Sequence, residues 1–591
     1  MTVPQKAADT QEWVVTLGVF VGMAMFSLSL TGLLFRLTPS SVAACLLLAF
    51  ATSALPSHRA RSGWPAASAW LALPPLATTA LAALLPPYTW DEVAYGAALP
   101  RMFAKAGRLL YDSDVGVYMA FPANYEAWVT GGLVLTRDVW ATQLLNVALA
   151  LGLAAIAVSL ARAVGVSRHV SFVAALFVLC APALIEEAPR TKNDVANAFF
   201  QALALLALSE CLEQPTILRA FRAGAFLGVA VGIKYSALHF LLALAPFAVV
   251  LLWSKAPSRG AGSRLVFAWG LGLAAFASTW YLRNLVSFGN PFFPFMNDTL
   301  GARNAFTATQ SELLRESIEG LGDFSLKSGL PSTFVVKTAQ GFGVLPVALL
   351  VPGALFALRS APRRVSTLVA GTALTYAGLT LLIGLWLPRY YLSLLAMAGA
   401  FAALAIERLS ESLQFAGLSP RIQKWLAVPA ILTVALWTAL PDWQEQARCV
   451  REMFQTGRRA FAQGHAPYFA VARWLNTHMA PGDKVAIGFN VQPFYYLDRP
   501  YYHIHPLTEG VGGLAESPDE FERSLQRFGA TLLAFSPGDG TYFENTAPKI
   551  SGFEDRVWMA QRRLRQAGRL RLVDSIGGVR ILRVVESGSA K

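Results

Sequence analysis

Long apolar runs recur from residue 13 to residue 441 of this 591-residue chain, and they restrict what it can fold into. A helix needs about 20 apolar residues to cross a bilayer, where unpaired backbone groups are not tolerated. Charged residues make up only 14% of the chain, whereas soluble domains carry about 25%. The sequence therefore predicts a polytopic, mostly α membrane protein with 13 spans at 13–35, 40–56, 66–87, 139–161, 170–187, 195–211, 222–234, 236–253, 265–285, 338–358, 366–386, 391–406 and 425–441.

The distribution of Lys and Arg predicts the orientation of these spans, because short cytoplasmic loops are enriched in both. With a cytoplasmic N-terminus, the inner loops hold 15 Lys and Arg against three acids; they are 57–65, 162–169, 212–222, 254–264, 359–365 and 407–424. The longer loops 88–137 and 286–337 then lie outside, as does the C-terminus. These inner loops explain much of the net charge of +13, so no nucleic-acid partner is expected.

Residues 442–591 contain no spanning run and are predicted to form a small extracytoplasmic α/β domain after the membrane domain 1–441. "KVAIGF" and "TLLAFS" are typical of short buried strands. "DEFERSLQRFG" and "RVWMAQRRLRQAG" have the spacing of amphipathic helices, and "LRLVDSIGGVRILRVV" predicts a closing hairpin.

Two outer loops supply candidate catalytic carboxylates. "PPYTWDEVAYG" places Asp91 and Glu92 at the outer interface, and "EEAPRTKNDVANAFF" places Asp194 at the start of a helix. Each has an ordinary alternative, a solvated acidic loop or a helix N-cap. A partly desolvated carboxylate at a lipid boundary is nevertheless suited to act as a base.

Cations at the same predicted level oppose the positive-inside trend. Lys234, Arg283 and Arg389 each stand at a predicted span end, where a snorkelling interfacial side chain is the ordinary reading. Together they could bind an anionic headgroup. Lys192 joins them as a candidate phosphate ligand, and the candidate substrate contacts are Tyr235, His239, Asn284 and Tyr390. The spacing of His, Cys and acidic residues supports no metal site.

The order of these motifs resembles the GT-C superfamily of integral-membrane glycosyltransferases over roughly residues 66–406. The motifs are an Asp-Glu pair, a second Asp opening a helix, Gly-x-Lys-Tyr, Trp-x-x-Arg-Asn followed by Gly-Asn-Pro, and Arg-Tyr-Tyr. The most similar branch contains the protein O-mannosyltransferases and the lipid A aminoarabinose transferase. The resemblance implies transfer of a hexose or pentose from a polyprenyl-phosphate donor to a glycan, lipid or protein hydroxyl, outside a bacterial inner membrane.

The resemblance also implies roles for the candidate residues. Asp91 would be the general base, Glu92 would contact the acceptor or shape the loop, and Asp194 would lie near the donor sugar or a metal. The cations would bind the donor phosphate. One base acting in a direct displacement would invert the anomeric configuration, and nearby cations would stabilise the leaving phosphate. A monophosphate donor needs no metal, whereas a diphosphate donor would favour a divalent cation.

Other functions stay open at this level. A transporter or lipid flippase would place ionisable residues near the bilayer midplane, but the predicted span interiors are almost free of charge. A ligase or polymerase that uses a lipid-diphosphate glycan fits the same outer-face acids. The tail could also bind envelope partners as part of a scaffold.

Overall fold

The computed structural model divides the chain into two compact units. The helical unit comprises Met1–Leu85, Pro122–Thr279 and Leu326–Gln455, and the sheet unit comprises Pro86–Phe121, Trp280–Ser325 and Thr456–Lys591. The structure describes residues 11–53, 76–112, 115–301, 310–312, 314, 330–359, 363–383, 387–415, 420–488, 491–505, 508, 518–536 and 548–585. The predicted inner loop 57–65 lies outside these residues, as do parts of the predicted segments 66–87, 286–337, 359–365 and 407–424.

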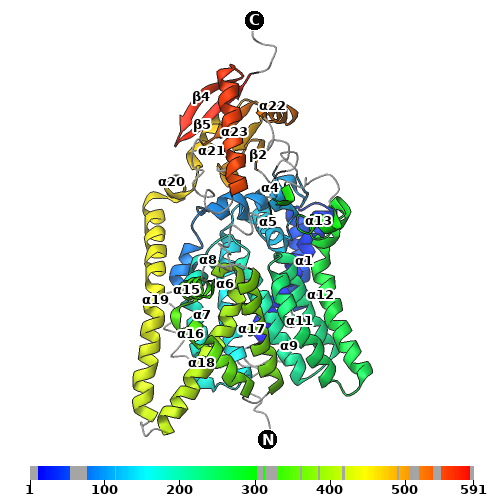
Figure 1. The fold of residues 1–591 in the computed structure, drawn as a ribbon, viewed down its shortest axis with the longest axis vertical. Coiled ribbons are helices and arrows are strands. Elements are labelled where there is room, and N and C mark those ends of the chain that lie inside the picture. Colours follow the sequence, from blue (N-terminus) through cyan, green and yellow to red (C-terminus); the bar gives the residue numbers. More distant parts are fainter. Residues whose placement is uncertain are drawn as a thin grey trace. The chain divides into compact units, whose positions relative to one another are not determined.

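Seven helices among the described residues are long and apolar enough to cross a membrane (Figure 1). They are α1 (Gln11–Leu34), α6 (Trp140–Ala163), α9 (Asp194–Glu213), α11 (Ala237–Lys255), α12 (Arg259–Phe288), α17 (Arg363–Ile383) and α18 (Leu392–Phe415), the last preceded by the turn η4 (Pro388–Tyr391). They confirm the polytopic helical class that the sequence predicts. The count of 13 crossings stays a prediction.

Shorter helices complete the helical unit. They are α2 (Pro39–Ser53), α5 (Asn124–Thr136), α7 (Arg168–Leu179), α8 (Pro182–Glu187), α10 (Ile217–Ile233), α15 (Leu330–Phe342) and α16 (Val344–Arg359). A further helix, α19 (Pro420–Thr456), runs for 37 residues. The predicted break near Lys234 is confirmed, because α10 ends at Ile233 and α11 begins at Ala237. Helix α5 lies within a segment that the sequence predicts as a loop.

Two predicted spans are broken. The run 170–187 divides into α7 and α8 at Pro182, because proline is favoured in the first turn of a helix and lacks the N–H that would bond to the preceding turn. The run 338–358 divides at Gly343 into α15 and α16, and the two helices are bent by 111°. The φ of Gly343 is +89°, a conformation that glycine adopts without a steric clash. The sequence does not predict either break, because apolar composition does not report the direction of the backbone.

Helices α10 and α12 approach each other closely through glycine. A methyl group on Gly224 would collide with the Trp269 carbonyl, and one on Gly272 would collide with the Phe221 carbonyl. One on Gly228 would lie 2.5 Å from the Leu273 carbonyl oxygen. Small residues allow such backbone contact between membrane helices. This packing fixes α10, and with it the position of Lys234 immediately beyond its end.

The sheet unit contains a five-stranded sheet in the order β2-β1-β3-β5-β4. The strands are β1 (Val485–Gly488), β2 (Tyr501–Ile504), β3 (Leu532–Phe535), β4 (Leu570–Ile576) and β5 (Val579–Val584). Strand β1 pairs in parallel with β2 and β3, whereas β5 pairs antiparallel with β3 and β4. The predicted strands and closing hairpin are confirmed, and β2 is an additional strand.

Successive side chains of β1 enter two separate hydrophobic cores, as the pleat of a strand requires. Ala486 packs in a core with Phe521 of α22 (Pro518–Arg527) and Val557 of α23 (Pro548–Gln566). Val485 and Ile487 pack in the other core, which also contains residues of α21 (Phe469–His478). The predicted α/β character of the tail is therefore confirmed.

Two earlier parts of the chain fold into the sheet unit with the tail. They contribute the turn η2 (Glu92–Gly96), the helix α4 (Ala98–Ala106), the turn η3 (Val117–Ala120), the end of α12 and the short helix α13 (Asn297–Leu300). The tail itself begins with α20 (Arg458–His465) and has a further turn, η5 (Phe494–Tyr496), between β1 and β2. The segment that carries Asp91 and Glu92 thus belongs to the sheet unit.

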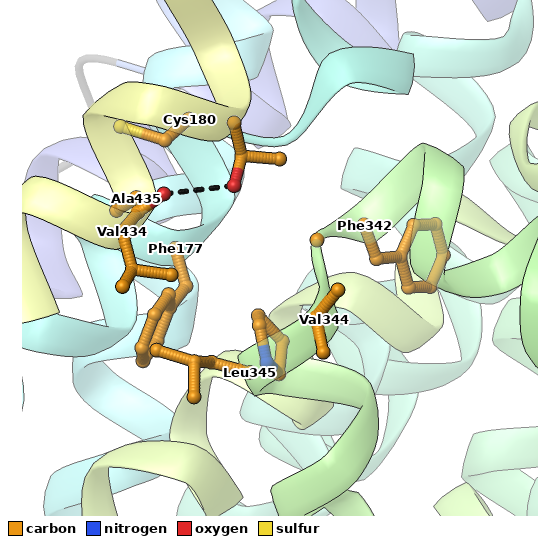
Figure 2. A pocket seen from close by; sticks show the side chains of 10 residues that line it. Phe177, Cys180, Phe342, Val344, Leu345, Val434 and Ala435 are labelled. Atoms are coloured by element: carbon orange, nitrogen blue, oxygen red, sulfur yellow. Dashed lines mark hydrogen bonds between the residues drawn. The ribbon is translucent and has the colours of Figure 1, made fainter.

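A pocket lies in the helical unit between α7, the α15–α16 bend and α19 (Figure 2). Its lining is mostly apolar, and Thr438 Oγ1 donates a hydrogen bond to the Val434 carbonyl at 2.8 Å. None of the described residues that line it is Asp, Glu, Lys, Arg or His. The pocket therefore offers apolar contact rather than acid–base chemistry.

Candidate functional site

The start of α9 and the end of α10 meet in an ion pair. Lys234 Nζ lies 2.6 Å from Asp194 Oδ1, and the two side chains are 24% and 6% exposed. Asp194 begins α9, where the helix dipole favours a negative charge. Lys234 follows α10 in an extended conformation, with φ −157° and ψ 141°, and so leaves the helix axis. The sequence predicts both residues as site residues, and the structure brings them together.

Glu126, near the start of α5, lies beside this pair. Its Oε1 accepts a hydrogen bond from Asn193 Nδ2 at 3.0 Å. Its Oε2 is buried and has no hydrogen-bond partner within the described part of the chain. Burial raises the pKa of Glu126 to about 7, although the Asn193 hydrogen bond and the Lys234 charge act to lower it. Glu126 therefore exchanges its proton near neutral pH.

A second buried ion pair lies on the loop before α9. Lys192 Nζ lies 3.0 Å from Glu187 Oε1, and both side chains are nearly inaccessible to solvent. Arg389 Nη1 lies 3.9 Å from the same carboxylate oxygen and is 21% exposed. Burial raises the pKa of Glu187, whereas Lys192 and Arg389 act to lower it. Lys192 therefore makes the shorter and more deeply buried contact with Glu187, and Arg389 makes the longer and more exposed one.

Tyr390 connects the two pairs. Lys234 Nζ lies 4.4 Å from the centroid of its ring, and Arg389 Cζ lies 5.3 Å from the same centroid. Cations at these distances are attracted by the negative face of the ring. We call the residues of the two pairs, with their neighbours, the charged cluster: Glu126, Glu187, Lys192, Asp194, Lys234, Arg389 and Tyr390.

Asn146 of α6 holds the loop that carries the second pair. Its Nδ2 lies 2.7 Å from the Arg190 carbonyl, 2.9 Å from the Lys192 carbonyl and 2.9 Å from Tyr125 Oη. Three residues after Asp194 in α9, Asn197 Nδ2 donates to Ser236 Oγ at 3.2 Å. Buried amides of this kind fix backbone positions, so the charged cluster rests on a rigid support.

Glu92 has a local structural role in the sheet unit. Its Oε2 accepts from Thr89 Oγ1 at 2.9 Å, from Thr89 N at 3.3 Å and from Tyr88 N at 3.4 Å. These hydrogen bonds tie the Glu92 carboxylate to the two residues that begin the turn. Glu92 is fully buried, whereas the adjacent Asp91 is half-buried. Asp91 therefore lies half-buried in a turn whose shape is held by the hydrogen bonds of Glu92.

Arg283 and Asn284 join the end of α12 to the segment before α5. The Arg283 guanidinium donates to the carbonyls of Met119, Ala120 and Phe121 at 3.0, 2.6 and 3.3 Å. Asn284 Nδ2 donates to the Ala120 carbonyl at 2.9 Å and to the Phe293 carbonyl at 3.1 Å. These contacts give both side chains a part in holding η3. Phosphate binding by Arg283 and substrate contact by Asn284 stay predictions.

The structure places the other predicted residues as follows. Tyr235 is half-buried directly after Lys234, and His239 is half-buried in the first turn of α11. Among the residues that the structure describes, no group of three or more His, Cys, Asp or Glu side chains could hold a metal ion.

Sequence reasoning missed Glu126 and Glu187 as site residues. Glu187 stands in the "EEAPRTKND" run, five residues before a Lys, but nothing in that run indicates a buried pair. Glu126 is one of five acids in the predicted loop 88–137, and only its place in "NYEAWVTGGLVL", next to a helical apolar run, hints at burial. Both are recognisable only once α5, α8 and α9 are packed together.

Comparisons with known proteins agree with this architecture. Residues 105–285 match the family model of the dolichyl-phosphate-mannose-protein mannosyltransferases. The crystal structure of ArnT from Cupriavidus metallidurans bound to undecaprenyl phosphate is 16% identical, with a TM-score of 0.55 over 89% of this chain and 99% of ArnT. The apo structure of the same protein is 16% identical, with a TM-score of 0.56 over 88% of this chain and 98% of ArnT. No curated protein sequence matches the chain. The chain therefore has the fold of the GT-C superfamily of integral-membrane glycosyltransferases and resembles its branch of protein O-mannosyltransferases and aminoarabinose transferases.

Proposed function

We propose that the protein is a glycosyltransferase that moves a sugar from a polyprenyl-phosphate donor to an acceptor hydroxyl at the outer face of the membrane. The observation that carries the proposal is the placement of Lys234 and Arg389 on Tyr390, against buried carboxylates, at the ends of membrane helices. The fold is shared with a protein that was crystallised with undecaprenyl phosphate, which supports a lipid phosphate as the ligand of these cations.

In this proposal Lys234 and Arg389 bind the donor phosphate. Both are partly exposed, whereas Lys192 is buried against Glu187. The Arg guanidinium matches phosphate oxygens with two parallel N–H donors, and Lys adds a point charge. The charged cluster holds three cations, Lys192, Lys234 and Arg389, against three acids. Because burial raises the pKa of both Glu126 and Glu187, protonation of either acid leaves the cluster with a net positive charge that favours the negatively charged sugar phosphodiester.

Asp91 is the proposed general base. As the acceptor oxygen attacks the anomeric carbon, Asp91 takes the hydroxyl proton, and the bond from the anomeric carbon to the phosphate oxygen breaks. A positioned base of this kind contributes roughly 100- to 10,000-fold. Lys234 and Arg389 stabilise the second negative charge that develops on the departing lipid phosphate. A single displacement inverts the anomeric configuration, and Asp194 orients the Lys234 ammonium through their 2.6 Å contact.

The proposal extends to the sugar, the acceptor, the membrane and the orientation of the protein. The transferred sugar is a hexose or pentose, and the acceptor is a glycan, lipid or protein. The membrane is the bacterial inner membrane, with the N-terminus in the cytoplasm. The C-terminal domain and the reacting groups then face the periplasm, where the donor arrives after it is flipped.

The test is transfer by the purified protein from a panel of polyprenyl-phosphate sugars. Asp91→Asn should lower turnover by roughly 100-fold or more, since an amide cannot accept the proton. Asp574→Asn is the matched control, because this half-buried carboxylate of β4 accepts its hydrogen bond from the neighbouring Ser575 N–H. Full turnover in Asp91→Asn would remove the assigned base. Lipid translocation by both forms, without sugar transfer, would favour a flippase.

A further inference from the structure

The turn that contains Asp91 is held together by hydrogen bonds among its own residues. The Val93 N–H donates to the Thr89 carbonyl at 3.1 Å, and Glu92 accepts the hydrogen bonds from Thr89 described above. This network fixes the shape of the turn. It does not fix where the turn lies, because each of its bonds joins residues of the turn itself.

The anchor of the turn comes from the C-terminal domain. Tyr496 of η5 donates its hydroxyl proton to the carbonyl of Pro87, at 2.6 Å. Pro87 is buried and directly precedes the turn. The Tyr88 ring packs edge-on against Phe461 of α20, with 5.2 Å between ring centroids. Val93, on the other side of Asp91, packs in a cluster with Ala462, Ala466 and Tyr496.

Helix α4, which follows the turn, is held by the same domain. Asp498, between η5 and β2, pairs with Arg101 at 2.9 Å and with Lys105 at 2.7 Å. Ala98 is part of the hydrophobic core that contains Val485 of β1. The two ion pairs are exposed and therefore weak. The Tyr496 hydroxyl acts on a buried carbonyl, so its loss leaves that oxygen without its donor.

We propose that the C-terminal domain is the positioning device for the Asp91 turn and that Tyr496 is its positioning residue. The proposal rests on the proposed function, because it takes Asp91 to be the base. A base works only when its oxygen meets the acceptor proton, and a misplacement of about 1 Å lowers turnover about 100-fold. The domain thus serves the transfer step without supplying a reacting group.

Tyr496→Phe in the full-length protein tests this directly, because it removes one oxygen and keeps the ring. We expect turnover to fall about 10- to 100-fold. The KM for the donor should stay unchanged, because Tyr496 is not among the residues proposed to bind the donor. Tyr502→Phe is the matched control. Its ring stacks on Phe528 at 3.7 Å in the other core of the same sheet, and its activity should equal that of the wild type.

A double variant separates positioning from general damage. If Tyr496 acts through Asp91, adding Tyr496→Phe to Asp91→Asn lowers turnover no further. Additive losses, or a raised donor KM in Tyr496→Phe, would overturn the proposal.

A thiol probe reports the turn without reference to catalysis. The four native cysteines are buried, so Asp91→Cys supplies the reactive thiol. Its alkylation rate should change severalfold when Tyr496→Phe is added and stay constant when Tyr502→Phe is added. An unchanged rate with Tyr496→Phe would contradict the positioning role. This result stands even if full turnover in Asp91→Asn shows that the proposed base is wrong.

Discussion

The Lys234 ammonium and the Asp194 carboxylate pair at 2.6 Å where the end of α10 meets the start of α9. One side chain is nearly inaccessible and the other is about three-quarters buried. Each therefore depends on the other for most of its solvation. Lys234 and Arg389 both lie near the Tyr390 ring, so this ring connects the Lys234–Asp194 pair to Arg389.

Removal of one partner should destabilise the protein more than removal of both. Lys234→Met leaves Asp194 buried without its cation, and we expect a loss of about 1–3 kcal/mol, below the ~3–5 kcal/mol of a fully buried pair. Lys234→Met combined with Asp194→Asn should recover most of this stability but not sugar transfer. Thermal unfolding in detergent and the transfer assay measure the two effects. A double variant as unstable as Lys234→Met would show that the pair does not carry the effect.

Substitution of Lys192 should mainly lower the stability of the protein, whereas substitution of Arg389 should mainly weaken donor binding. Lys192→Met leaves Glu187 without its 3.0 Å partner in a buried site, so we expect a loss of about 3 kcal/mol. Arg389→Met breaks a longer and more exposed contact, so stability should change by less than about 1 kcal/mol. The donor KM should rise about tenfold or more in Arg389→Met, which corresponds to ~1.4 kcal/mol of binding. The reverse pattern would assign phosphate binding to Lys192.

Glu126 should make stability depend on pH. Its pKa is raised from 4.5 to about 7 in the folded protein, so between these values the folded state holds a proton that the unfolded state has lost. Stability should therefore fall as the pH rises from about 4.5 to about 7, by as much as about 3 kcal/mol, and then level off. Glu126→Gln should make this decline smaller without abolishing it, because burial also raises the pKa of Glu187, whereas the exposed Glu213→Gln should keep the full decline. Melting temperatures at pH 5 and pH 8 measure the difference, and identical declines in all three proteins would exclude Glu126 as the cause.

The predicted break at Lys234 and the strands of the tail were accessible from sequence for local reasons. The pattern of apolar residues repeats within a few positions, and a Lys inside an apolar run marks a helix end. The bend at Gly343 and the division at Pro182 were not anticipated, because a hydropathy window averages over residues that point in different directions. Glu126 was missed for a related reason, since its partners Asn193 and Lys234 are distant in sequence.

The sequence by itself determined the class of the protein. Its apolar runs are stable only in a bilayer, its tail has no run that could span one, and its charges stand at the ends of the runs. It also supplied Asp194, Lys234 and Arg389 as candidates, because an ionisable residue beside an apolar run is costly unless it has a use. Only the tertiary structure decided their partners. It paired Lys234 with Asp194 and Lys192 with Glu187, and it built the Asp91 turn into the C-terminal domain. The physical reason is that propensity and hydropathy are properties of neighbours along the chain, whereas pairing, burial and pKa depend on neighbours in space.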